Sequence, residues 1–316
     1  MGDLYINLER SKQVTVILFE KFNSDEGIFG HNVMPEDLLP TWGSDLSKSG
    51  IKRDSYENLM FITLVVSIDY QRDADQLWNA GRKTFEDERT RWLFIPNEVV
   101  KKTLLEISKT MKIHRLAKKP QKDAGIWYNV SKSLFESYES NPKILIEQCN
   151  NDALLIFNKK FDSRFKRAFP FLSGDKIFPL WIRMLHDNVD VDLKNLNKIP
   201  IPVDVHTARA TFTTGCLIGR YRGTISGIKN RVDEAWEKTL EQVNHPKLTY
   251  RLQLDEPLWH LSKYGCRFRE YFCPKKGMCP VKKFCVNGLT HVSALGVEIE
   301  TSETNEEIST NNLMLK

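Results

Sequence analysis

The sequence lacks the two features that would direct the protein into or across a membrane. No apolar run reaches the ~18–20 residues that a bilayer-spanning helix needs. The opening segment, MGDLYINLERSKQVTVILFE, carries charges throughout and has no signal-peptide cleavage pattern. We therefore expect a cytoplasmic protein without a membrane partner, associated with the nucleoid if the cell is prokaryotic.

Strand-like alternation of apolar and polar residues is also scarce, which favours an all-α fold. From Tyr56 onward apolar residues recur at helical spacing, and after Pro202 they do so again as far as Phe212. Residues 14–22 fit either a strand or a helix. The spacing predicts further helices at 97–110, 123–138, 142–157, 175–186, 228–243 and 256–264.

Charge of one sign is not in large excess, because the formal net charge is only +5. Two segments are nevertheless strongly basic. The acids within 101–132 are Glu106 and Asp123, and the acid within 263–283 is Glu270. Such blocks are often solvated faces, but they also suit a surface that contacts nucleic-acid phosphates.

Cysteine is sparse outside one cluster. Six cysteines occur in the chain, and four of them form the pattern C-x6-C-x5-C-x5-C: Cys266, Cys273, Cys279 and Cys285. A reducing compartment favours a thiolate-bound metal or iron–sulfur centre over disulfides. The long gaps differ from the C-x2-C knuckles typical of zinc, but spacing alone leaves both an iron–sulfur cluster and a zinc ion open. Cys149 and Cys216 lie in apolar helical contexts and are expected in the core.

Three segments follow one another in a definite order along the chain. A turn between two apolar helical stretches contains Gly174-x-Lys176, the run Ile-Pro-Ile-Pro leads into Val203-Asp204-x-His206, and the cysteine loop ends at Cys285. In this order the chain resembles the endonuclease III superfamily of helix-hairpin-helix DNA glycosylases, over roughly residues 56–285. The hairpin region is similar to archaeal 8-oxoguanine DNA glycosylases, and the cysteine loop is similar to endonuclease III and MutY. The second likeness implies that the four clustered cysteines hold a 4Fe–4S cluster, with zinc as the alternative.

The resemblance implies a fold of two helical lobes with a DNA groove between them. A six-helix barrel would cover 56–195 and include the helix-hairpin-helix at about 165–186. The second lobe would cover 196–290 with the cluster loop 266–285, and an N-terminal extension at 1–55 would pack on it. The polar tail at 301–316 has no aromatic residue and is expected to be disordered. We expect a monomer.

The resemblance also implies an activity: flipping and excision of a damaged or modified base from double-stranded DNA, with 8-oxoguanine as the leading substrate. Asp204 would stabilise the positive charge that develops on the sugar, although aspartate there is equally suited to be a helix N-cap. Lys176 would attack the same carbon as a neutral amine and add apurinic/apyrimidinic-site lyase activity. An apolar pocket formed by Phe171, Ile177 and Trp181 could favour that neutral form.

The remaining site residues are expected to contact DNA. The hairpin residues Ser173 and Gly174 would approach a phosphate through the backbone. Tyr70 and Gln71 match the position where the family fills the gap left by the extruded base, although an exposed helix end without a role fits them equally well. His206 would shape the helix start beside Arg209.

Three alternatives remain open at this stage. Lys176 could instead contact a phosphate, and the enzyme would then be a monofunctional glycosylase that uses an Asp-activated water. The hairpin could also serve a non-catalytic DNA-binding protein. Trp127 and Tyr128 could stack on a flipped base, although core packing suits them better.

Overall fold

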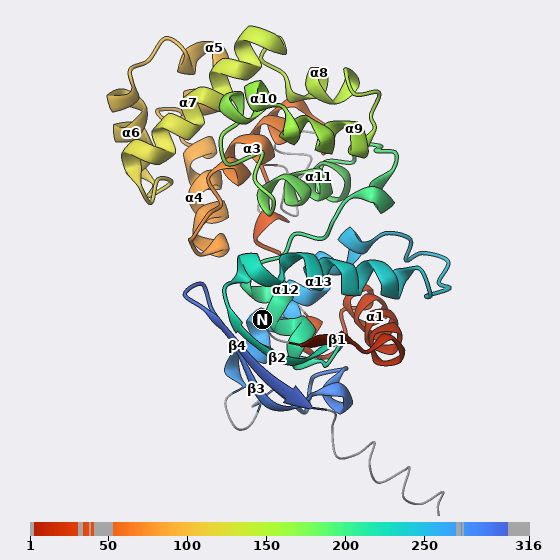
Figure 1. Cartoon of the computed structure of the whole chain (residues 1–316). Coiled ribbons are helices and arrows are strands. Elements are labelled where there is room, and N and C mark those ends of the chain that lie inside the picture. Colours follow the sequence, from red (N-terminus) through yellow and green to blue (C-terminus); the bar gives the residue numbers. More distant parts are fainter. Residues whose placement is uncertain are drawn as a thin grey trace, which may run out of the picture. The chain divides into compact units, whose positions relative to one another are not determined.

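The computed structural model describes residues 3–30, 34–37, 39–40, 53–269, 273 and 275–302 (Figure 1). It is mostly helical and contains a four-stranded antiparallel sheet. The chain divides into two compact units. We call Val33–Ile199 the central unit, and Met1–Asn32 together with Pro200–Lys316 the terminal unit.

The central unit is built around α3 (Tyr56–Ser67), which is buried from Asn58 to its end. Its neighbours are α4, α7, α8 and α11. Two buried tryptophans tie this core together through their ring nitrogens: Trp181 donates to Thr63 Oγ1 at 3.0 Å and Trp127 donates to the Leu93 carbonyl at 2.7 Å. The other helices are α4 (Ala74–Glu86), α5 (Pro96–Val99), α6 (Leu104–Ile113), α7 (Pro120–Ser137), α8 (Pro142–Glu147), α9 (Ala153–Asn158), α10 (Ser163–Ala168) and α11 (Ile177–Asp187).

Two of the expected helices are each divided into two shorter ones. The helix expected at 97–110 is interrupted because Thr103 starts α6 with a capping box that also uses the side chain of Glu106. The helix expected at 142–157 is interrupted because Asp152 caps α9, accepting hydrogen bonds from the amides of Leu154 and Leu155. Side-chain caps satisfy the first amides of a helix and so start a new one inside an apolar pattern.

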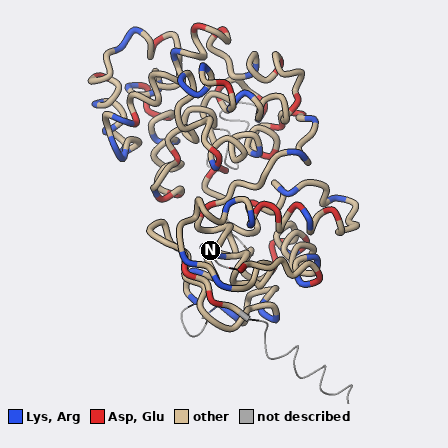
Figure 2. The backbone as a smooth tube through the Cα atoms, in the orientation of Figure 1, with Lys and Arg blue, Asp and Glu red and all other residues tan. Residues whose placement is uncertain are grey.

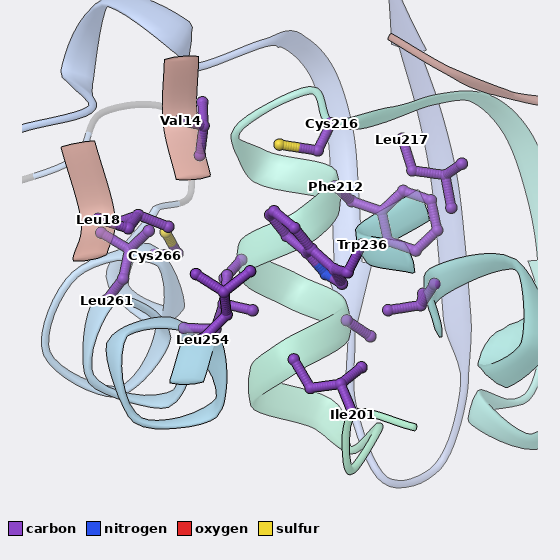
Figure 3. Packing of buried hydrophobic residues seen from close by; sticks show 14 of the residues in the cluster. Val14, Leu18, Ile201, Phe212, Cys216, Leu217, Trp236, Leu254, Leu261 and Cys266 are labelled. Carbon is purple, nitrogen blue, oxygen red and sulfur yellow. The ribbon is translucent and has the colours of Figure 1, made fainter. Parts of the chain in front are cut away.

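In its described residues the terminal unit combines four helices with the sheet: α1 (Leu8–Asn23), α12 (Val205–Thr213), α13 (Ile225–Leu240) and α14 (Asp255–Tyr264). The strands β1 (Leu4–Ile6), β2 (Leu217–Gly223), β3 (Asn287–Val292) and β4 (Val297–Ser302) follow the order β1-β2-β4-β3. Figure 3 shows part of the core around α12, where Phe212 and Trp236 are fully buried. The Trp236 ring nitrogen donates to Thr211 Oγ1 at 3.0 Å.

The sheet corrects the expectation of an all-α fold. Its strands are short, and β3 is mostly exposed, so neither face gives a clear alternating pattern in the sequence. Pairing joins segments far apart in the chain, since Leu4 lies opposite Gly219 and Tyr221 opposite Ile299. Local periodicity does not report such long-range pairing.

The boundaries of the expected segments also change. Thr301 and Ser302, which were expected in a disordered tail at 301–316, belong to β4, and residues 303–316 lie outside the described part. In the extension expected at 1–55, the part from Val33 onward belongs to the central unit. The reason is an almost fully buried ion pair between Glu36 and Arg183 of α11, which holds residues 34–37 there. Within the described residues, no helix combines the length and apolar character needed to cross a membrane.

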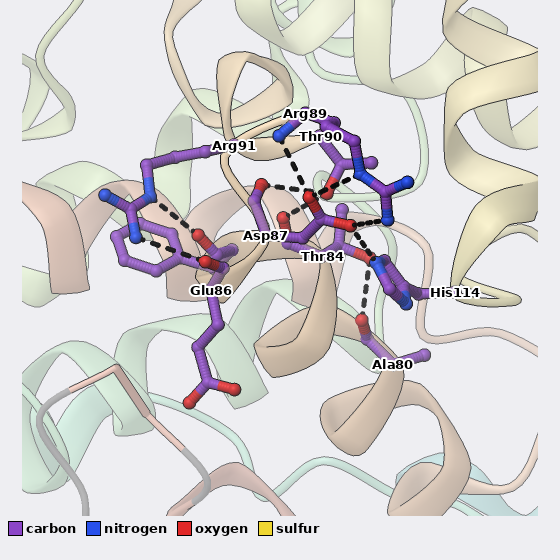
Figure 4. A network of polar contacts seen from close by, with 9 residues as sticks. Ala80, Thr84, Glu86, Asp87, Arg89, Thr90, Arg91 and His114 are labelled. Atoms are coloured by element: carbon purple, nitrogen blue, oxygen red, sulfur yellow. Dashed lines mark hydrogen bonds and ion pairs between the residues drawn. The ribbon is translucent and has the colours of Figure 1, made fainter.

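A polar network joins the end of α4 to the end of α6 in the central unit (Figure 4). Asp87 follows α4 and accepts hydrogen bonds from Arg89, at 3.0 and 2.7 Å, and interacts with His114 Nε2 at 2.9 Å. The hydrogen bonds from Arg89 and His114 hold the pKa of the Asp87 carboxyl well below its ordinary value. The charged form of Asp87 therefore stabilises the folded chain.

We expect the Tm of Asp87→Asn to lie below that of the wild type at pH 7, and the difference to shrink from about pH 4 downward. A carboxylate with a depressed folded-state pKa contributes fully above its unfolded-state pKa and loses that contribution as the pH falls through the folded-state value. Thermal unfolding followed by circular dichroism between pH 7 and pH 3 measures this. A difference that widens on acidification contradicts the assignment.

Candidate functional site

Asp204 is the N-cap of α12. The preceding Ile-Pro-Ile-Pro run forms neither helix nor strand, and the Asp204 backbone (φ −129°, ψ −167°) is extended where the helix begins. Its Oδ1 accepts hydrogen bonds from the amides of His206 at 2.7 Å and Thr207 at 3.1 Å. The capping role considered from the sequence is therefore confirmed. It holds a half-buried carboxylate in a defined orientation at a helix N-terminus, where amides and the helix dipole favour negative charge.

His206 and Arg209, on the same helix, have partners within the terminal unit. His206 Nδ1 lies 3.3 Å from Ser262 Oγ. Arg209 donates to Ser262 Oγ at 3.1 Å and to the Val292 carbonyl at 2.6 Å, so it connects α12 with α14 and β3. Burial lowers the pKa of Arg209, while Cys266 and Asp204 act in the opposite direction. Arg209 thus has an internal role that the sequence did not reveal.

Trp259 is a neighbour of this helix start that the sequence reasoning missed. Its ring centroid lies 5.5 Å from that of His206, and Lys263 Nζ lies 4.4 Å from its centroid. The ring is only half-buried. A tryptophan on a short amphipathic helix next to the cysteine loop was the available signal, but spacing alone does not distinguish it from a core residue.

The four clustered cysteines line one pocket in the terminal unit. Cys266 is buried and the other three are half-buried. Burial, together with the neighbouring thiols of the cluster, raises the pKa of the Cys266 and Cys279 thiols, that of Cys279 to about 12. The same pocket is lined by Thr213, Leu261, Gly265, Arg269, Lys276 and Lys282.

The four thiols line this pocket but are not arranged as the ligands of a metal ion. Across the described ranges, no group of three or more His, Cys, Asp or Glu side chains has the geometry to hold a metal ion. Cys149 and Cys216 are buried elsewhere, as expected of core residues.

The cysteine loop is held by the N-terminal segment. Arg10 of α1 is buried and donates to the Phe284 carbonyl at 2.9 Å, and the Ile28 amide donates to the Met278 carbonyl at 3.0 Å. Arg269 donates to Thr290 Oγ1 at 3.1 Å and so attaches the start of the loop to β3. The sequence predicted that the N-terminal segment packs on this lobe but left its role open, because contacts across more than 250 residues leave no local pattern.

The expected hairpin is the connection between α10 and α11 in the central unit. Phe171 has a left-handed backbone (φ 63°), and its carbonyl accepts the Gly174 amide at 2.9 Å. A Cβ on Gly174 would lie 2.9 Å from that carbonyl oxygen, so the turn favours glycine. Ser173 is buried, and its amide donates to Phe169. Lys176 is the half-buried N-cap of α11.

Tyr70 and Gln71 lie beside this hairpin. The Tyr70 ring stacks on Phe171 with centroids 4.6 Å apart and an interplanar angle of 22°. Gln71 is exposed, has a left-handed backbone (φ 52°), and its Oε1 accepts from Lys119 Nζ at 3.0 Å. Two segments separated by about 100 residues, each expected to contact DNA, therefore meet within the central unit. Phe171 thus stacks on Tyr70. Trp127 is fully buried in the core, as core packing predicts.

Charge alone does not identify a DNA-contacting face. Figure 2 shows Lys and Arg interspersed with acids along both units. Several lysines of the 101–132 block have acidic partners, for example Lys101 with Glu98 at 2.8 Å. The lysines that surround Tyr70 and Phe171 are therefore a more specific sign of a DNA-contacting face than the 101–132 block as a whole.

We expect Asp204→Ala to lower the free energy of unfolding by about 1 kcal/mol, because it removes the N-cap of α12. Asp204→Asn should leave it nearly unchanged, since asparagine caps equally well. Urea denaturation followed by circular dichroism measures both, with exposed Asp192→Ala as the control. Equal losses for the Ala and Asn variants would mean that the charge, and not the cap, stabilises the helix.

Comparison with models of known protein families finds no match, and comparison with curated proteins finds none either.

Proposed function

We propose that the protein is a base-excision DNA glycosylase of the helix-hairpin-helix class, which flips and excises a damaged or modified base from duplex DNA. The leading substrate is 8-oxoguanine. The observation that carries the proposal is the pocket shared by Cys266, Cys273, Cys279 and Cys285, because these cysteines are the most specific part of the sequence resemblance. The capped carboxylate of Asp204 supplies the expected catalytic group.

The chemistry of the pocket fits a 4Fe–4S cluster. Four thiol donors surround it, and a thiolate-ligated cluster carries net negative charge that Arg269, Lys276 and Lys282 would offset. When bound, the cluster supplies a structural crosslink for the loop. Zinc, held by the same four thiolates, is the alternative.

The chemical step depends on charge at the sugar. Excision breaks the N-glycosidic bond, and the departing base takes the bonding electrons, so positive charge develops on the sugar. The Asp204 carboxylate stabilises this charge. Because Oδ1 is held by the amides of His206 and Thr207, little reorganisation is needed during the reaction.

Lys176 is proposed as the nucleophile of a lyase reaction. Its neutral amine forms a bond to the anomeric carbon as the base leaves, ring opening gives a Schiff base, and β-elimination then breaks the bond to the 3′ phosphate oxygen. Lys176 is the half-buried N-cap of α11, and its attack requires the neutral form of the amine.

We expect Asp204→Asn to reduce excision of 8-oxoguanine by about 100- to 1000-fold while DNA binding and folding are retained. Single-turnover base release from a panel of duplexes with defined lesions measures the rate. Asp152→Asn is the matched control, because Asp152 caps α9 in the same way. Undiminished excision by Asp204→Asn would exclude Asp204 as the catalytic carboxylate, whereas DNA binding by the wild type without excision from any duplex would support the non-catalytic alternative.

Borohydride should trap a covalent adduct between the wild-type protein and DNA with an abasic site, and Lys176→Gln should abolish the adduct. The exposed Lys143→Gln, on α8, should leave it unchanged. Excision without any trapped adduct would establish the monofunctional reaction, in which Lys176 contacts the DNA backbone instead.

Protein purified without oxygen should contain iron and a visible charge-transfer absorbance. Cys279→Ser should lose both, because it removes one of four ligands, whereas Cys149→Ser should keep both since Cys149 is buried in the central unit. Metal analysis separates the alternatives. Zinc in place of iron would support the zinc alternative. A wild-type protein that contains neither metal would overturn the proposed centre.

A further inference from the structure

The stacked rings of Tyr70 and Phe171 are accessible at the surface of the central unit. Phe171 is 38% exposed, although phenylalanine usually lies inside, and Tyr70 is half-buried. Lys122 Nζ lies 4.4 Å from the Phe171 centroid and 4.8 Å from the Tyr70 centroid, and Lys119 Nζ lies 5.4 Å from the Tyr70 centroid. We call these four residues the stacking platform.

The platform is held in place before any ligand arrives. The Tyr70 hydroxyl donates to Asp123 Oδ1 at 2.5 Å, and Asp123 Oδ2 accepts the amides of Lys118 and Lys119, each at 2.8 Å. Burial and the hydrogen bond to Asp123 raise the pKa of Tyr70, so this hydroxyl stays protonated and keeps donating. On the other ring, the left-handed turn at Phe171 is closed by the Gly174 amide.

The surroundings of the platform favour an anion. Lys118, Lys119 and Lys122 are exposed, whereas the acid among them, Asp123, is buried and its oxygens are occupied by the contacts just described. Gly125 lies one turn after Lys122 on the same face of α7, and a Cβ there would meet no atom within 4 Å. Open space therefore lies one helical turn from Lys122.

We propose that the stacking platform binds an unpaired nucleobase together with the phosphate next to it. A flat aromatic surface can stack on any base, and lysines beside it can contact the backbone. A base within an intact duplex has both faces covered by its neighbours, so it cannot stack on the platform. The protein should consequently bind strands with unpaired bases more tightly than fully paired DNA. This preference lies beyond the proposed excision reaction and does not require it.

The test is binding of the full-length protein to undamaged oligonucleotides at fixed salt concentration. The probes are a single-stranded 12-mer DNA with 2-aminopurine near its centre and the same strand in a fully paired duplex. Anisotropy of an end label gives the affinity, and quenching of 2-aminopurine reports stacking. We expect the wild type to bind the single strand more tightly and to quench it.

Phe171→Leu keeps an apolar side chain but removes the aromatic face. We expect it to weaken single-strand binding about tenfold and to abolish quenching, with duplex binding changed by less than about twofold. Lys122→Gln should weaken single-strand binding and lower its salt dependence. Lys132→Gln, on the same helix but paired with Glu136, should behave as the wild type.

Single-strand affinity and quenching that are unchanged in both Phe171→Leu and Lys122→Gln would overturn the proposal, as would equal losses for single strand and duplex. Circular dichroism tests whether Phe171→Leu is folded, and the exposed Lys122→Gln provides a second variant. Gly125→Gln is a third, and we expect it to weaken single-strand binding by filling the open space. An RNA strand of the same sequence tests whether the sugar matters. Because no probe carries a lesion, failure of this test is distinguishable from failure of Asp204→Asn to reduce excision.

Discussion

The buried guanidinium of Arg10 is the contact on which the cysteine pocket depends. It extends from α1 to the Phe284 carbonyl, one residue before the last clustered cysteine, across most of the chain length. A buried cation needs such acceptors, because its desolvation is otherwise costly. Its approach requires Gly215, which has a left-handed backbone (φ 69°) and where a Cβ would lie 2.9 Å from Arg10 Nη1. The N-terminal helix, the turn before β2 and the cysteine loop therefore form one interdependent structure.

A second constraint concerns the start of α12. The prolines before Asp204 disfavour a helix there, and the Asp204 carboxylate then accepts hydrogen bonds from the first amides of α12. Capping and catalysis are compatible here, since a carboxylate used as a cap is already oriented and already stabilised as an anion. Arg209 and Ser262 connect this helix to α14, which also carries Trp259. The proposed catalytic group thus belongs to a connected set of contacts within the terminal unit.

The central unit contributes a surface of a different kind. Its hairpin turn brings Phe171 onto Tyr70, and Asp123 organises both the tyrosine and the start of α7. A buried acid beneath three exposed lysines leaves positive charge at the surface while satisfying the backbone below. Aromatic rings and lysines in this arrangement suit nucleic acid, which presents flat bases and phosphates together.

The sequence by itself determined the features that depend on near neighbours along the chain. These were most of the helices, the cap at Asp204, the turn at Gly174, the core positions of Cys149 and Cys216, and the grouping of the four loop cysteines, whose common pocket lies in the terminal unit. Only the tertiary structure decided how the four strands pair, which contacts Arg10 and Arg209 make, and that Tyr70 stacks on Phe171. Caps, turns and helical periodicity are set by residues within a few positions of one another, whereas strand pairing and buried side-chain contacts join segments that share no local pattern.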